Sequence, residues 1–98
     1  MTFPSVELSL VTSPACHLCE DSEQALTRLI AGGAPLELTV HDATSAAGAA
    51  LVAEHRPALF PLLLVDGEYF SAGRLPRRKL QAHLARRRAA ANAGVSRG

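Results

Sequence analysis

The sequence predicts an α/β fold with the order βαβαββα, in which helices flank a four-stranded mixed sheet. Two stretches alternate apolar and polar residues as strands do, and the segments that follow them carry apolar residues at helical spacing or are rich in alanine. A continuous apolar run that ends in an Asp-Gly pair then predicts a hairpin. The 98 residues, 48% of them hydrophobic, fit one globular domain with one core.

The first part of the chain contains a strand, a helix and a second strand. Residues 6–12 alternate apolar and polar side chains, and the Ser-Pro pair that follows ends this strand. From His17 onward apolar residues recur at helical spacing until the glycine pair Gly32-Gly33. Residues 36–41 alternate again and predict a second half-buried strand.

The middle of the chain predicts a short helix and a buried strand. Residues 45–55 are rich in alanine, and Asp42 or Thr44 is expected to cap a helix there. Gly48 lowers the helix propensity of this segment, although its small side chains would let it pack close to the sheet. Residues 60–65 form a continuous apolar run, which is typical of a central strand buried on both faces.

The last part of the chain predicts a hairpin and a final helix. Asp66-Gly67 is a two-residue turn that tolerates positive φ, so residues 68–71 are expected to return as an antiparallel strand. Pro76 suits the first turn of a last helix that buries leucines one turn apart.

The end of the chain has small residues without a pattern. We therefore expect one domain over residues 1–90, followed by a flexible tail over residues 91–98.

Charge is divided unevenly along the chain. All nine acidic residues precede Tyr69, whereas of the ten basic residues only Arg28 and Arg56 do, so the last helix is strongly basic. A basic run without interleaved aromatic residues is usually a solvated helix face, so nucleic-acid binding is not expected. No apolar run is long enough to span a bilayer, and a monomer without membrane attachment is expected.

Cys16 and Cys19 are the only cysteines and lie at the expected start of the first helix. A helix N-terminus offers free N–H groups and the positive end of the dipole, which stabilise a thiolate and lower its pKa. We expect Cys16 to be the exposed nucleophile and Cys19, a turn inward, the resolving thiol. His17, if protonated, would add positive charge beside Cys16, whereas Glu20 and Asp21 would oppose it, and the sequence leaves this balance open.

Two other interpretations of the pair stay open. A C-x-x-C is half of a zinc or iron–sulfur site, and the four histidines are possible further ligands, although none has tight metal-ligand spacing to another. The chain could also be a catalytically weak interaction module that keeps the pair. Two cysteines so close in sequence do not cross-link distant elements, so the chain is not a disulfide-framework secreted protein. A reducing cytoplasm is therefore the expected compartment.

The run V-T-S-P-A-C-H-L-C, followed later by F-P-L-L-L-V-D-G-E, resembles glutaredoxin-like proteins of the thioredoxin superfamily. The resemblance is strongest to a small uncharacterised group with the active-site motif C-x-L-C. It implies a thioredoxin-like fold and a thiol-disulfide oxidoreductase acting on a disulfide-containing protein or a small thiol. It also implies that Pro61 is cis and faces Cys16, and that the Phe60 backbone pairs with an extended substrate or glutathione.

The flanks of the motif differ from those of the glutathione-using members. Residues 12–15 carry no charge, the pair encloses His17-Leu18, and the turn before the last helix has one glycine and no acid. Arg74 is the residue of that turn that can reach a substrate carboxylate, so His17 and Arg74 join Phe60 and Pro61 as expected substrate-binding residues. No tightly bound cofactor is expected. Glutathione, another low-molecular-weight thiol or a reductase is the expected reductant.

Overall fold

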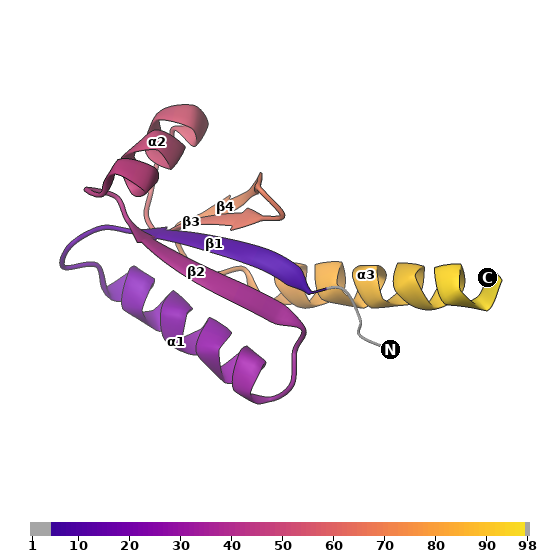
Figure 1. Ribbon diagram of the computed structural model, residues 1–98. Helices are drawn as coiled ribbons and strands as arrows, with labels where there is room; N and C mark the ends of the chain where they lie inside the picture. Colours follow the sequence, from indigo (N-terminus) through magenta and orange to yellow (C-terminus); the bar gives the residue numbers. More distant parts are fainter. Residues whose placement is uncertain (1–4, 98) are drawn as a thin grey trace.

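The computed structural model describes residues 5–97 and has the predicted element order (Figure 1). The elements are β1 (Val6–Thr12), α1 (His17–Ala31), β2 (Leu36–Asp42), α2 (Ala46–His55), β3 (Leu62–Val65), β4 (Glu68–Ala72) and α3 (Arg77–Arg97). Among these residues, no helix has a stretch that is both long and apolar enough to cross a membrane.

The four strands form one mixed sheet in the order β2-β1-β3-β4. Strand β1 pairs in parallel with β2, and its other edge pairs antiparallel with β3, which continues into β4 through the hairpin. The β1–α1–β2 unit is the crossover that a parallel pair requires. This arrangement, with helices on both faces, is that of a thioredoxin-like fold.

Helices cover both faces of the sheet, and the alternation along β1 decides which side chains meet which helix. Helices α1 and α3 lie on one face and α2 on the other (Figure 1). Val6, Leu8 and Leu10 of β1 point into the larger core cluster, whereas Val11 points into the smaller one. The larger cluster also contains Leu26, Leu36, Leu63, Val65, Phe70, Leu75 and Leu80; the smaller one has Leu62 and Leu64, packed by Ala43, Leu51, Val52 and Phe60.

The cap of α2 differs from the prediction. Ser45, and neither Asp42 nor Thr44, is the N-cap, because its Oγ accepts a hydrogen bond from the Gly48 N–H at 3.0 Å. Asp42 instead uses its carboxylate Oδ1 to accept from the N–H and the hydroxyl of Thr44, both at 2.7 Å. The Asp42 side chain is therefore occupied by the turn that precedes the helix.

Two further boundaries differ from those expected. Strand β3 begins at Leu62, because Pro61 has no N–H to donate and the Phe60 carbonyl faces the cysteine pair. Helix α3 continues to Arg97, into the segment assigned to a tail. Alanine dominates this part of the chain, and alanine has the highest helix propensity, so the absence of an apolar pattern did not end the helix.

The predicted turn at Asp66-Gly67 is present, with φ of 51° and 83°. Asp66 also joins three elements. Its N–H donates to the Glu7 carbonyl at 2.8 Å, and its Oδ1 accepts from the Glu7 N–H at 3.1 Å. Its Oδ2 forms an ion pair with Arg87 of α3. The hairpin is thereby fastened to β1 on one side and to α3 on the other.

Candidate active site

Cys16 is the N-cap of α1. The chain leaves β1 through a short loop in which Ala15 has φ of 53°, and Cys16 is extended, with φ −110° and ψ 105°. Its Sγ accepts a hydrogen bond from the Cys19 N–H at 3.1 Å, in the position that a serine or aspartate oxygen occupies in most helix caps. The sulfur therefore lies where the free N–H groups of the helix converge.

Cys16 and Cys19 are joined by a disulfide bond, with their Cα atoms 5.2 Å apart. The two sulfurs differ in access: Cys16 is half-buried, whereas Cys19 is 3% exposed and lies among core residues. Only the Cys16 sulfur is therefore accessible to a substrate disulfide. This difference in access is the one that a nucleophile and a resolving thiol require.

Phe60 and Pro61 form the opposite wall of the site. The bond between them is cis, which confirms the expectation drawn from the resemblance. The Phe60 carbonyl oxygen lies 4.0 Å from Cys16 Sγ, and Pro61 is buried. Gly73, whose importance the sequence did not reveal, donates its N–H to the Pro61 carbonyl at 2.9 Å and so ties this wall to the turn before α3.

The structure places the His17 side chain in solvent. Its side chain is 97% exposed, and its Nδ1 lies 4.0 Å from Glu20 Oε2. A protonated His17 would thus have a carboxylate beside it. Of the expected substrate-binding residues, Phe60 and Pro61 lie beside Cys16, whereas His17 faces solvent.

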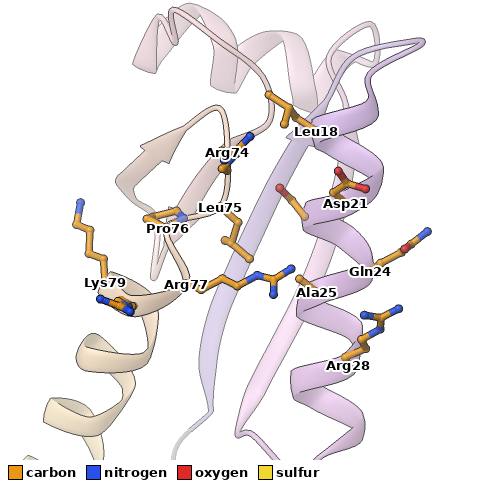
Figure 2. Close-up of a pocket in the computed structure, with 12 residues that line it drawn as sticks. Leu18, Asp21, Gln24, Ala25, Arg28, Arg74, Leu75, Pro76, Arg77 and Lys79 are labelled. Atoms are coloured by element: carbon orange, nitrogen blue, oxygen red, sulfur yellow. The ribbon is translucent and has the colours of Figure 1, made fainter.

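Arg74 lies at one end of a groove between α1 and the start of α3 (Figure 2). The groove has a volume of about 680 Å³ and begins at Leu18, which stands between the two cysteines. It is lined by Leu18, Asp21, Ser22, Gln24, Ala25, Arg28, Arg74, Leu75, Pro76, Arg77, Arg78 and Lys79. Sequence reasoning missed it, since the two walls lie far apart in the chain. The one available signal was the run of cations at the start of the last helix.

The residues that the structure describes do not gather a metal site around the cysteines. No group of three or more His, Cys, Asp or Glu side chains lies close enough together there to hold an ion. His55 Nε2 lies 3.4 Å from Glu54 Oε2, and His83 packs edge-on against the Phe70 ring with 5.8 Å between ring centroids.

Comparison with known proteins leaves the site to be interpreted from its own geometry. No family model matches the chain, and a search of curated proteins finds no match.

Proposed function

We propose that this protein is a glutaredoxin-like thiol-disulfide oxidoreductase that uses Cys16 and Cys19 as its reactive pair. One observation carries the proposal: a disulfide at the start of α1 in which one sulfur is accessible and the other is buried. The cis Phe60–Pro61 bond, whose Phe60 carbonyl oxygen lies 4.0 Å from Cys16 Sγ, supports the same conclusion. We place the protein in the cytoplasm, where low-molecular-weight thiols and reductases can return the pair to its reduced form.

The reaction proceeds through two exchanges. In the reduced protein the Cys16 thiolate attacks one sulfur of a substrate disulfide, which forms a mixed disulfide and releases the other substrate sulfur as a thiolate. The Cys19 thiolate then attacks Cys16 Sγ, which forms the Cys16–Cys19 disulfide and releases the second substrate sulfur. The released thiolates take up protons from water. The substrate has gained two electrons and the protein has lost two.

A thiol reductant closes the cycle. Two molecules of a monothiol such as glutathione, or one dithiol, reduce the Cys16–Cys19 disulfide and are themselves converted to a disulfide. The same exchanges run backwards when the protein meets a dithiol that is easier to oxidise. Which direction dominates depends on the reduction potential of the pair relative to that of its partners.

The proposal predicts different behaviour for the two serine variants. The wild type should accelerate the reduction of insulin by dithiothreitol, and Cys16→Ser should reduce the rate to the uncatalysed background, because it removes the accessible nucleophile. Cys19→Ser keeps that nucleophile and lacks the resolving thiol, so it should accumulate a mixed disulfide with a substrate peptide, visible by mass spectrometry.

Two results would contradict the proposal. A wild type as inactive as Cys16→Ser would argue for an interaction module. Stoichiometric metal or visible absorbance after anaerobic purification would instead favour a metal or iron–sulfur protein.

A further inference from the structure

We propose that the groove between α1 and α3 binds an acidic peptide segment, and that the preferred substrates are proteins whose disulfide is flanked by acidic residues. This inference rests on the proposed function, because it assigns a substrate class to the same site. It is carried by the position of the groove, by the charges that line it and by the way those charges are held.

The position of the groove fits a chain that continues from the reacting disulfide. Leu18 lies between Cys16 and Cys19 in the chain and also lines the groove. Arg74 stands opposite Leu18 at the same end (Figure 2). Gly73, just before Arg74, is hydrogen-bonded to the Pro61 carbonyl, so Arg74 is attached to the wall that faces Cys16. A peptide bound over Cys16 can therefore enter the groove directly.

The charges on the groove walls are almost all positive. Arg28 lines it from α1, and Arg74, Arg77 and Arg78 line it from the other side, against the single carboxylate of Asp21. Figure 2 shows the Arg77 side chain extending across the groove towards Ala25 of α1. Within the described part of the chain, none of these four arginines has a carboxylate within ion-pair distance.

Lys79 does not belong to this set, although it lines the groove. Its Nζ donates to the Phe70 carbonyl at 3.0 Å and lies 4.6 Å from the centre of the Phe70 ring. In Figure 2 it points away from α1. Lys79 is thus engaged in holding α3 to β4, and the arginines are the groups that remain available for a ligand.

The start of α3 is also electrostatically unfavourable on its own. Its first turn holds Arg77, Arg78 and Lys79 and no acidic residue, although this turn lies at the positive end of the helix dipole. Acidic side chains stabilise a helix at this end, and basic ones stabilise it at the other. Carboxylates in the groove would offset this repulsion and that among the arginines, and each guanidinium can take a carboxylate through two hydrogen bonds.

The test compares two disulfide substrates that differ only in charge. Each is a peptide with one cysteine joined by a disulfide to a fluorescent thiol, with three residues on either side that are glutamate in one peptide and glutamine in the other. The wild type should reduce the glutamate peptide with a kcat/KM about tenfold higher, since two or three exposed ion pairs supply that factor. The difference should shrink in about 0.5 M sodium chloride.

Two double variants, each of which removes two positive charges, show whether the preference for the glutamate peptide arises in the groove. Arg74→Gln with Arg77→Gln should bring the preference below about threefold, because only part of the ion-pair contribution remains. Arg86→Gln with Arg88→Gln should keep it, since those exposed residues of α3 do not line the groove. Equal kcat/KM for both peptides in an active wild type would overturn the groove proposal and leave the oxidoreductase intact.

A binding measurement separates this proposal from the enzymatic one. Versions of the two peptides with serine in place of cysteine are titrated into the protein by fluorescence anisotropy, without any redox step. Tighter binding of the glutamate peptide, lost in Arg74→Gln with Arg77→Gln, supports the groove even if insulin reduction fails. No difference in affinity, or an equal loss in Arg86→Gln with Arg88→Gln, would count against it.

Discussion

Cys16 uses one sulfur atom for two purposes. Its Sγ caps α1 by accepting from the Cys19 N–H, and the same atom is the more accessible sulfur of the disulfide and the proposed nucleophile. A hydrogen bond from a backbone N–H stabilises a thiolate more than a neutral thiol. The local backbone therefore favours the ionised form of this cysteine in the reduced protein.

Alkylation of the Cys19→Ser variant tests this ionisation, because Cys16 is then the only thiol and the capping N–H is retained. The rate of reaction with iodoacetamide should rise with pH through a midpoint below the pKa of about 8.5 of a free cysteine. A cysteine in an unfolded peptide of the same local sequence, measured in parallel, should show the ordinary midpoint. A midpoint at or above 8.5 in the folded variant would contradict activation of Cys16 by the cap.

Among the elements, α2 is the one whose position requires a close approach of its backbone to a neighbouring strand. Of the described helices, it is the one that packs on the smaller core cluster, and it is held to the end of β2 at Gly48, which is buried. A Cβ added to Gly48 would lie 1.9 Å from the Asp42 carbonyl oxygen and 2.7 Å from the Asp42 carbonyl carbon. The glycine that weakens the helix by propensity is thus what allows the helix to reach its place.

Gly48→Ala should therefore destabilise the protein, even though the same change in an exposed helix stabilises it by about 1 kcal/mol. Because backbone must move to admit the methyl group, we expect a loss of about 1–3 kcal/mol in the free energy of unfolding, measured with urea. Ala49→Gly, at an exposed position of the same helix, should cost about 1 kcal/mol through propensity alone. A more stable Gly48→Ala would show that α2 does not pack this closely.

At the scale of the whole molecule, Asp66 connects the sheet with the last helix. Its pKa is lowered, chiefly by the hydrogen bond from Arg87 and further by the N–H of Glu7, with partial burial acting in the opposite direction. A carboxyl whose folded-state pKa lies below its unfolded value stabilises the fold above about pH 5, and this contribution is lost as the pH falls through the lowered pKa. Because the side chains of Asp66 and Arg87 are 37% and 39% exposed, solvent screening limits the pair to about 0.5–1 kcal/mol.

Asp66→Asn tests this link while keeping the oxygen that accepts from the Glu7 N–H and a residue that tolerates positive φ. The variant should be less stable than the wild type at about pH 7, and the difference should shrink as the pH falls from about 5 through the lowered pKa of Asp66. Arg87→Gln should give the same pattern, whereas Arg86→Gln, at an exposed neighbouring position, should not. A difference between Asp66→Asn and the wild type that persists unchanged at about pH 3 would exclude ionisation of Asp66 as its cause.

Features set by neighbouring residues were predictable from the sequence. The alternation along β1 and β2, the apolar spacing of α1 and the Asp66-Gly67 turn each arise within a short segment, and the structure contains all of them. The juxtaposition of Phe60 with Cys16 was expected only through the resemblance to glutaredoxin-like proteins, because nothing local connects residues so far apart.

Features that depend on contact between segments were missed. The Ser45 cap was assigned to its neighbours, because three residues able to cap a helix stand close together and only the backbone geometry selects one. The groove between α1 and α3 has one wall on α1 and the other before and within α3, so no periodicity in the sequence reveals it. The role of Gly73 depends on its hydrogen bond to Pro61, which no sequence pattern encodes.

The capping hydrogen bond to Cys16 has a consequence for the direction of electron flow. Helix α1 places an N–H group against a sulfur that is neutral in the disulfide and would carry negative charge as the thiolate of the proposed reduced pair. Whatever strengthens the start of α1 therefore favours the dithiol over the disulfide, and a pair whose reduced form is stabilised is a stronger oxidant. In the proposed oxidoreductase, the quality of the helix cap, ordinarily a matter of fold stability, would therefore adjust the reduction potential of the pair.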